Sequence, residues 1–407
     1  MASALRMMLL AGLATGLSAC LVPTYECSGV ANPPGTGDGV DQTATAPVAK
    51  PIWPTLGGDR SRSAQSGLVG PQSADHASFF AAGSGFVRSV LVGADGTLYV
   101  SGDGVLYVMD ESTGAVKWTF EGTGYFSPGL GPDGTVYVGT ARNEVLALNP
   151  ANGDVYWTES FSQLRSPINV AADRTVFFLT SEPEALHALD GRTGKEKWTY
   201  STSIAEAAPA IGQDGTVYLQ DVSKVYALDG QTGTLKWSTS ACDGAFTNRY
   251  GPTVANGTVY VGGYQVHQYE DMGRDSKVHA FDAQTGAPKW QAPVDSAVWV
   301  TPAVGADGTV YVGTWYGGLY ALDGQTGARK WTAEATTLSF DDVSFAVDAE
   351  GTLYFVDGWG RVSALDGQTG QAKWTMKAQS NLGAGPAIGK GGTLYVGALG
   401  GLYSIAR

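Results

Sequence analysis

An eleven-residue phrase recurs along this chain and constrains its fold more than any other feature. It reads ALDGQTGARKW over residues 321–331, and near-copies end at Trp237 and Trp374. A second phrase, Gly-Thr followed by Val or Leu and an aromatic residue, starts eight times, with Arg174 in place of the glycine in the third copy. Its starts lie 38 to 51 residues apart. Repeats of this length are typical of architectures in which each copy is one supersecondary unit.

Each repeat has the pattern of four short strands. In one repeat, residues 127–132 lead through an Asp-Gly turn into TVYVGT (135–140), then VLALN (145–149), then a strand around a tryptophan. Antiparallel four-stranded units of about forty residues are propeller blades. The sequence therefore predicts an all-β, eight-bladed β-propeller over residues 52–407.

The last repeat stops at Arg407 after its third strand, so its fourth strand has to come from elsewhere. Residues 76–96 match the stretch that leads from one repeat to the next. We expect residues 77–82 to complete the eighth blade and close the ring. Closure removes two exposed sheet edges, which would otherwise favour aggregation.

The repeated phrase has the chemistry of a structural clasp between blades. Its aspartate can accept backbone N–H bonds in an Asx-turn, and its glycines can adopt positive φ without steric strain. A tryptophan that packs against the next blade buries roughly 150–250 Å². We therefore favour the clasp over the alternative of seven equivalent binding sites. The seven tryptophans are Trp118, Trp157, Trp198, Trp237, Trp290, Trp331 and Trp374.

The phrase resembles the tryptophan-docking repeat AxDxxTGxxxW of pyrroloquinoline-quinone (PQQ) type propellers. The resemblance covers residues 86–407, and the lead-in WPTLGGDRSRSAQSG (53–67) is similar to the W-P-x-x-G-G-D opening that precedes such propellers. It implies the propeller fold, while the family contains both dehydrogenases and non-enzymatic scaffolds. Within the family the chain is most similar to the BamB-like lipoproteins of the outer-membrane β-barrel assembly machinery. That similarity implies docking to periplasmic domains of a barrel-inserting protein.

The N-terminus has the pattern of a lipoprotein signal peptide over residues 1–19. A positive start precedes a short apolar stretch, MMLLAGLATGL (7–17), and LSAC follows, ending at Cys20. This ending resembles the bacterial lipobox and implies acylation of Cys20; an ordinary secretory signal cut near Ala19 is the alternative. Leu21, in place of aspartate, favours the outer membrane, with the protein facing the periplasm or the cell surface. Residues 20–51 are rich in Pro, Gly and Thr and predict a flexible tether.

The cysteines and the net charge bear on a possible disulfide and on the class of binding partner. Cys27 and Cys242 are a candidate disulfide pair in an oxidising compartment, and the sequence leaves their bonding open. The net charge of −13, without clustered Lys or Arg, argues against nucleic-acid binding.

One face of the predicted propeller is expected to carry function. The turns between strands one and two and between strands three and four hardly vary, whereas the other connections differ in every blade. A varied face of loops is where binding residues usually lie. It is rich in the residue types that dominate protein interfaces. The candidate partner-binding residues are Arg142, Arg165, Arg249, Tyr250, Tyr264, His267, Tyr269, Arg274, Trp299, Trp315, Tyr316, Trp359 and Arg361.

Two other functions stay open from the sequence. A PQQ- and Ca²⁺-dependent dehydrogenase would need oxygen ligands, for which Asp341, Asp342 and Asp357 are candidates. A carbohydrate- or peptide-binding propeller would use a central funnel lined by rings such as Trp315 and Trp359. We expect neither catalytic residues nor a cofactor or metal, and favour a monomeric, lipid-anchored scaffold that binds an envelope protein.

Overall fold

The computed structural model describes nine stretches of the chain: residues 52–55, 58–124, 127–203, 208–221, 223–240, 251–263, 276–298, 300–334 and 345–407. Contacts divide the chain into Met1–Gln42 and Thr43–Arg407, and every described residue belongs to the second unit. The described residues form strands and turns, with no helix among them. The predicted signal peptide, the tether up to residue 51 and all three cysteines lie outside the described residues.

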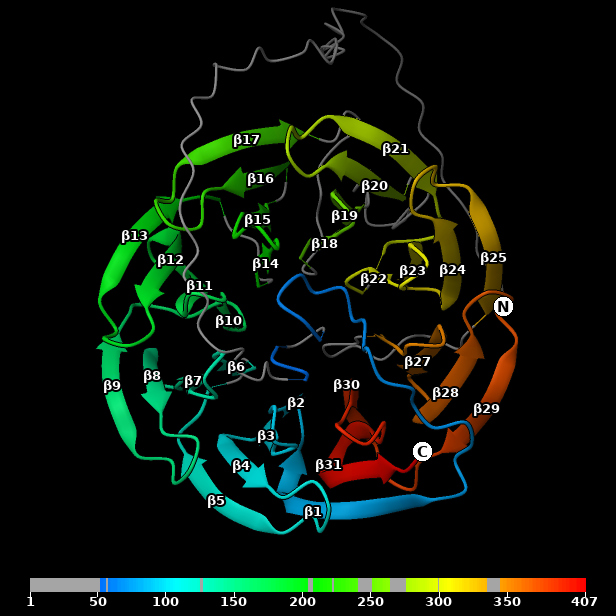
Figure 1. Ribbon diagram of the computed structural model, residues 1–407, viewed down its shortest axis with the longest axis horizontal. Coiled ribbons are helices and arrows are strands. Elements are labelled where there is room, and N and C mark those ends of the chain that lie inside the picture. Colours follow the sequence, from blue (N-terminus) through cyan, green and yellow to red (C-terminus); the bar gives the residue numbers. More distant parts are fainter. Residues whose placement is uncertain are drawn as a thin grey trace, which may run out of the picture. The chain divides into compact units, whose positions relative to one another are not determined.

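Eight small antiparallel sheets are arranged around a common centre (Figure 1). In each blade the first strand is innermost and the fourth is outermost. The all-β, eight-bladed propeller predicted from the repeats is thus confirmed. Seven sheets have four strands each, and the strands, in chain order and grouped by blade, are as follows: β2 (Ser89–Val92), β3 (Leu98–Gly102), β4 (Val105–Met109) and β5 (Val116–Glu121); β6 (Gly129–Leu130), β7 (Val136–Gly139), β8 (Glu144–Leu148) and β9 (Val155–Ser160); β10 (Asn169–Val170), β11 (Thr175–Ser181), β12 (Glu184–Asp190) and β13 (Glu196–Ser201); β14 (Ala210–Ile211), β15 (Val217–Gln220), β16 (Lys224–Leu228) and β17 (Leu235–Ser240); β18 (Thr253–Ala255), β19 (Thr258–Gly263), β20 (Lys277–Asp282) and β21 (Pro288–Pro293); β22 (Ala303–Val304), β23 (Thr309–Gly313), β24 (Gly318–Asp323) and β25 (Arg329–Glu334); β26 (Ala346–Val347), β27 (Thr352–Val356), β28 (Arg361–Asp366) and β29 (Ala372–Lys377).

The eighth sheet joins the two ends of the described chain. Its order is β1 (Ala77–Phe86), β31 (Leu394–Ile405) and β30 (Leu382–Ile388). β31 alone contains the sequences that form the second and third strands of the other blades. β1 runs antiparallel to it, in a register that pairs Ala77 with Ile405 and Ala81 with Gly401.

The core lies between neighbouring sheets. The second and third strands of each blade are almost fully buried, whereas the outer strands alternate between exposed and partly buried residues. One cluster, for example, joins Leu91 and Leu106 of the first blade to Leu130 and Leu148 of the second. Each blade therefore buries its apolar faces only against its two neighbours.

The clasp tryptophans connect consecutive blades by hydrogen bonds. The indole Nε1 of Trp331 donates to the carbonyl oxygen of Gly367 in the next blade at 2.8 Å. The hydroxyl of Tyr311, on the second strand of the same blade as Trp331, donates to that same oxygen at 3.2 Å. The other six indoles donate in the same way, to Pro150, Gly191, Gly230, Ala283, Gly324 and Pro71.

In six of the seven clasps the glycine of the turn lies directly against the indole of the preceding blade. A Cβ atom on Gly370 would stand 2.8 Å from Cδ2 of Trp331, and the φ of Gly370 is +73°. Glycine is therefore required here twice, for its backbone conformation and for the close approach of the ring. Trp331 is 9% exposed, so this contact excludes most solvent from the ring.

Between the eighth and first blades a phenylalanine takes the place of the tryptophan. The ring of Phe80, on β1, lies against Gly114 of the first blade, where a Cβ would stand 2.6 Å from the ring. Trp374 has no eighth clasp turn to contact and donates instead to Pro71, which precedes β1. The closing segment thus supplies both halves of the missing clasp.

We predict that Gly370→Ala destabilises the fold more than Gly351→Ala. Both glycines have positive φ, at +73° and +81°, so alanine costs roughly 1–2 kcal/mol at either position. Only Gly370 meets an indole, whereas nothing lies within 4 Å of a Cβ at Gly351. Overpacking should add about 1–3 kcal/mol to the first variant alone. Equal free energies of unfolding in urea would show that the ring contact is not tight.

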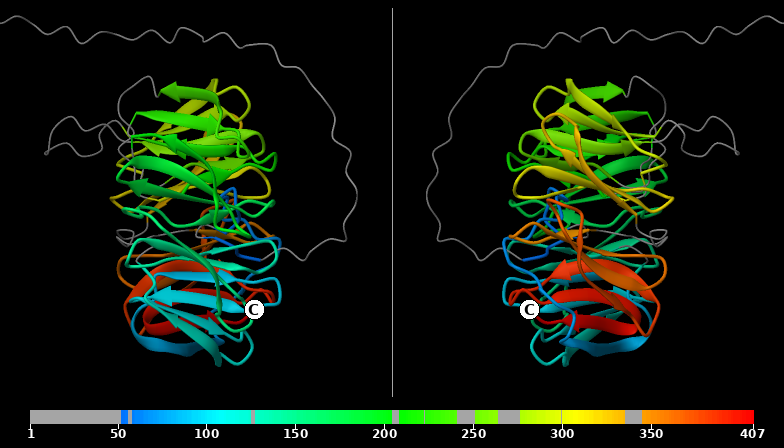
Figure 2. Two further views of the ribbon diagram at one scale, coloured as in Figure 1. Left: turned by 90° about the vertical axis from the view of Figure 1, so that its left-hand side faces the viewer. Right: turned by 90° about the vertical axis from the view of Figure 1, so that its right-hand side faces the viewer.

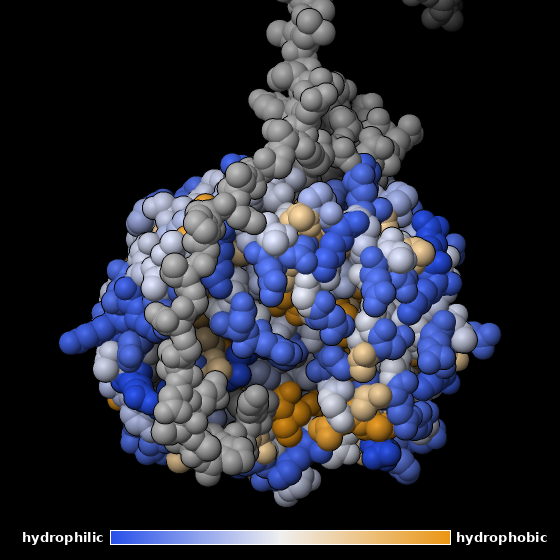
Figure 3. Space-filling view, turned by 45° about the horizontal axis from the view of Figure 1, so that its top comes forward, coloured by the Kyte–Doolittle hydropathy of each residue, from blue (hydrophilic) through white to orange (hydrophobic). Residues whose placement is uncertain are grey.

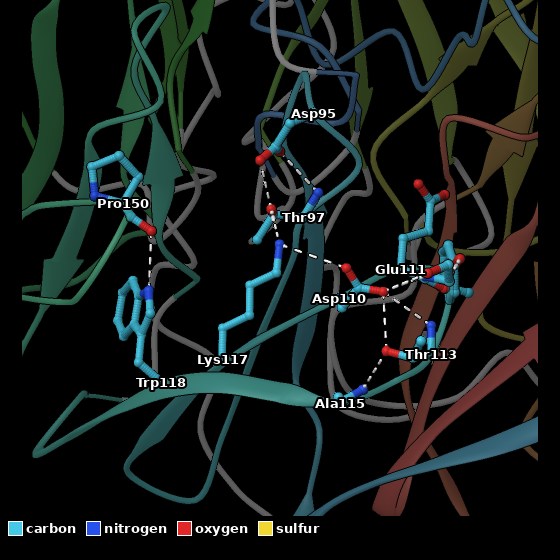
Figure 4. A network of polar contacts seen from close by, with 11 residues as sticks. Asp95, Thr97, Asp110, Glu111, Thr113, Ala115, Lys117, Trp118 and Pro150 are labelled. Carbon is cyan, nitrogen blue, oxygen red and sulfur yellow. Dashed lines mark hydrogen bonds and ion pairs between the residues drawn. The ribbon is translucent and has the colours of Figure 1, made fainter.

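Six of the seven clasp turns are built around an aspartate, as Figure 4 shows for the first blade. Oδ1 of Asp110 accepts bonds from the hydroxyl of Ser112 at 2.6 Å and the backbone N–H of Thr113 at 3.1 Å. Nζ of Lys117 donates to the hydroxyl of Thr97 at 2.8 Å, which ties the outer strand to the second strand. Hydrogen bonds from Ser112 and Thr113 lower the pKa of Asp110 to about 2.

We predict that Asp110→Asn removes part of the acid sensitivity of the fold. Because its pKa is lowered in the folded state, the Asp110 carboxylate contributes stability that is present above its ordinary value of 3.8. That contribution is lost as the pH falls through about 2. The stability difference between wild type and variant should therefore shrink between pH 4 and pH 2 in urea titrations. A difference that is constant over this range would contradict the assignment.

The lead-in segment lies at the centre of the ring, where Figure 1 shows it in blue. We call residues 52–55 and 58–66 the central segment. Its carbonyl oxygens accept backbone N–H bonds from the innermost strands of six blades, at 2.8–3.0 Å. The donors are Val92, Leu130, Ile211, Val254, Val304 and Val347.

Two arginines of the central segment extend these contacts. Nε of Arg60 donates to the carbonyl oxygen of Val170, which adds the third blade. Arg62 is 4% exposed; it donates to the carbonyl oxygen of Ala208 at 2.6 Å and to the hydroxyl of Thr301 at 3.1 Å. Burial raises the pKa of Asp59, against hydrogen bonds from Ser63 that lower it. The central segment therefore crosses the middle of the ring and bonds to seven of the eight blades.

Candidate functional site

Strand direction assigns the connections to two opposite faces. Because the strands of a blade are antiparallel, the turn after its first strand and the turn after its third strand lie on one face. The turn after the second strand and the link to the next blade lie on the other, which we call the variable face. The C-terminus and the central segment lie towards the first face, as the side views of Figure 2 show.

Six of the thirteen candidate partner-binding residues lie in the described part of the chain, all of them on the variable face. They are Arg142, Arg165, Trp315, Tyr316, Trp359 and Arg361. The remaining seven lie outside the described residues: Arg249, Tyr250, Tyr264, His267, Tyr269, Arg274 and Trp299.

Trp359 is an exposed aromatic residue of the variable face whose turn is held by several contacts. It lies at the tip of the turn between β27 and β28 and is 60% exposed. Its backbone N–H donates to Oδ1 of Asp357 at 3.0 Å. The guanidinium of Arg361 lies 5.0 Å from the centre of the indole, within the range of a cation–π interaction.

Asp357 fixes the arginine that contacts this ring. The Asp357 side chain is almost fully buried, and its Oδ2 accepts Nε and Nη2 of Arg361, each at 2.7 Å. Its Oδ1 also accepts the backbone N–H of Arg361 at 3.0 Å. A two-pronged pair of this kind orients the guanidinium plane as well as neutralising its charge. Asp357 is thereby committed to the turn, which weighs against the metal-ligand role considered from the sequence.

Tyr316 occupies the corresponding position in the sixth blade. It follows β23 and is 64% exposed. Thr314 holds the turn, because its hydroxyl donates to Asp295 at 2.7 Å and accepts the N–H of Gly318 at 3.1 Å. Adjacent blades thus present an exposed ring at the same point of the same turn. In the second blade that position is Arg142, whose exposed side chain lies after Thr140.

Groups suited to metal binding are not gathered in the described residues. No cluster of three or more His, Cys, Asp or Glu side chains within them is arranged to hold a metal ion. Of the carboxylates considered from the sequence, Asp341 and Asp342 lie outside them. His187 is buried and bonds to Glu196 at 2.7 Å, and His279 stacks on Phe281. Across the same part of the chain, no helix has the length and hydropathy to span a membrane.

Sequence reasoning missed the central segment and the Asp357–Arg361 pair. The lead-in, residues 53–67, was recognised only by its resemblance to other propellers, and its position at the centre of the ring was not predicted. The pair had a signal in the sequence, because an aspartate and an arginine four residues apart flank an exposed tryptophan in a short turn.

Comparisons with known proteins agree with this architecture. Residues 103–276 match the family described as outer membrane protein assembly factor BamB. The solved structure of BamB from Moraxella catarrhalis superposes with a TM-score of 0.62 at 18% identity, covering 78% of this chain and 94% of that one. A europium-containing methanol dehydrogenase superposes with a TM-score of 0.65 at 14% identity, covering 86% and 89%. At these identities the two structures show the fold alone.

A relative found by sequence belongs to a third class of protein, the kinases. The chain is 28% identical over 196 residues to the serine/threonine-protein kinase AfsK of Streptomyces griseus, covering 44% of this chain and 23% of that protein. The chain thus spans about a quarter of the length of that relative. The repeat pattern, the partial family match and the superpositions together support a PQQ-like repeat β-propeller fold. This fold is shared by proteins with different activities.

Proposed function

We propose that this protein is a lipid-anchored, non-enzymatic scaffold of the cell envelope that binds a partner protein through its variable face. The observation that carries the proposal is the pair of exposed rings, Trp359 and Tyr316, at equivalent turns of adjacent blades. The role is of the kind that the name of BamB describes, assembly of outer-membrane proteins.

Energetics favour an interface at these rings. Exposing the apolar surface of a tryptophan or tyrosine ring to water is unfavourable in free energy. Interface hot spots are enriched in Trp, Tyr and Arg. Trp359 loses little conformational entropy on binding, because Arg361 and Asp357 already restrict it. The opposite face is built from the repeated clasp turns, whose aspartates accept bonds mainly from their own turn and whose lysines bond to the threonine at the start of the second strand.

The envelope location rests on the sequence and on the family match. The lipobox-like LSAC at residues 17–20 supplies the anchor, and the family described as an outer membrane assembly factor matches residues 103–276. In this arrangement the lipid holds the protein at a membrane while the variable face contacts the partner.

A site-specific crosslinking experiment tests the proposal. A photo-reactive amino acid is placed at Trp359 or Tyr316, and, as matched controls in the same blades, at Gln368 or Gln325 of the opposite face. We expect one envelope protein to be captured from the first two positions and not from the controls. The purified partner should then bind the Trp359→Ala variant at least about tenfold more weakly, as expected for loss of a hot spot. Equal capture from both faces, or unchanged affinity, would contradict the proposal.

The non-enzymatic part has its own test. The protein is incubated with PQQ and Ca²⁺, and the dye-linked oxidation of alcohols and sugars is measured alongside quinone binding. We expect no turnover above that of a heat-denatured sample. Saturable quinone binding with turnover would replace the scaffold by a dehydrogenase.

A further inference from the structure

The repeats allow every position to be compared with its equivalents in the other blades, and four departures on the clasp-turn face lie at one place. The residue before the clasp tryptophan is lysine in six blades and Tyr156 in the second. The clasp aspartate is replaced in that blade alone, by Asn149. The glycine before the second strand is replaced in one blade of eight, by Arg174. The glutamine of four clasps is replaced by Arg192 in the third blade.

These four residues line one pocket between the second and third blades. Its volume is about 340 Å³, and we call it the blade 2–3 pocket. The remaining lining residues are Asp133, Thr135, Tyr137, Pro150 and Gly191. Independent departures from a repeat are not expected to converge in space unless they act together.

Two of these four departures take part in an exchange of ion-pair partners. In other blades the lysine pairs with nearby aspartates, as Lys197 does with Asp173 at 3.3 Å. In the second blade Tyr156 cannot do so, and Asp133 pairs instead with Arg174 of the third blade at 3.0 Å. Arg174 accepts a φ of +73° to reach this position. This exchange explains Arg174, but it leaves Arg192 and the exposed ring of Tyr156 unexplained.

The exchange leaves a local excess of positive charge on an acidic protein. Two arginines, Arg174 and Arg192, face one aspartate, whereas the net charge of the chain is −13. Two larger pockets on the same face have more acidic than basic residues in their linings. Figure 3 shows a mostly hydrophilic surface in which hydrophobic areas are small and separate.

Tyr156 adds a flat apolar surface beside these charges. It is 56% exposed, in a position where other blades direct a lysine towards the second strand. An aromatic ring beside a guanidinium can hold a second ring by stacking while the guanidinium binds an attached anion. A guanidinium fork matches a planar carboxylate, and Arg174 already binds the carboxylate of Asp133 here.

We propose that the blade 2–3 pocket binds a small carboxylate attached to a flat ring. Arg192 receives the carboxylate, Tyr156 stacks on the ring, and Asn149 and Thr135 offer polar contacts at the rim. A volume of about 340 Å³ suits a single-ring ligand. The site lies on the face opposite the proposed partner-binding surface, so it stands independently of the scaffold function.

Benzoate serves as the probe, with binding to the whole protein measured by ligand-detected NMR titration. We expect saturable binding that weakens about tenfold in Arg192→Gln, as expected for loss of a charge-assisted hydrogen bond. This variant should fold normally, because Gln231, Gln284, Gln325 and Gln368 stand at the same position in other blades. Tyr156→Ala should weaken benzoate and leave the weaker binding of acetate unchanged.

A matched control variant and two related probes separate the proposal from general attraction of anions. Gln325→Arg places an arginine at the equivalent point of the sixth blade, where Lys289 of the fifth blade stands in the position of Tyr156. This variant should gain no second benzoate site. Benzamide, which lacks the charge, should bind more weakly than benzoate. Absence of saturable benzoate binding, equal affinity in Arg192→Gln, or tighter binding of phenyl phosphate would overturn the proposal.

Discussion

The structure depends on one contact repeated around the ring: an indole lying on a glycine of the next blade and donating to a carbonyl oxygen beside it. Trp331 with Gly370 and Gly367 is the tightest example in burial, and each partner explains the other. The glycine cannot be replaced because the ring lies against it, and the indole N–H finds a buried carbonyl oxygen there, which it shares with the hydroxyl of Tyr311. A four-stranded sheet with two apolar faces is unstable alone. This contact turns eight such sheets into one body.

The same dependence explains which features were predictable. Contacts that every blade makes require the same residues at a fixed spacing, and this repeat in the sequence predicted the number of blades and the order of their strands. A structural feature that occurs only once produces no repeat in the sequence, so it cannot be recognised in this way. The central segment bonds to inner strands mainly through backbone groups, which any sequence can supply, and Phe80 stands in for tryptophan without resembling the repeated phrase. The exchange in which Arg174 replaces a lysine partner of Asp133 is visible only once the two blades are seen side by side.

On the variable face, the sequence predicted which residue types are exposed, but not the contacts that hold them in place. The exposure of Trp359 and Tyr316 is what their position in short turns suggests. That Arg361 is held by Asp357 beneath the indole depends on rotamers and on burial of the carboxylate, which spacing alone does not determine. The two faces therefore differ in kind. One is made of clasp turns that follow the repeat, with four departures gathered at the blade 2–3 pocket, and the other carries exposed rings held by contacts within their own turns.

The pairing of β1 with β31 has a consequence for how the protein is made. Ala77 lies opposite Ile405, so this sheet closes a loop that contains nearly the whole body of the chain. Closing so long a loop is entropically costly and slow compared with forming a hairpin. Before β31 has been synthesised, the earlier blades can stack as an open arc, but the ring cannot close. Cellular quality control therefore encounters an open ring with two unpaired sheet edges until β31 is available to pair with β1.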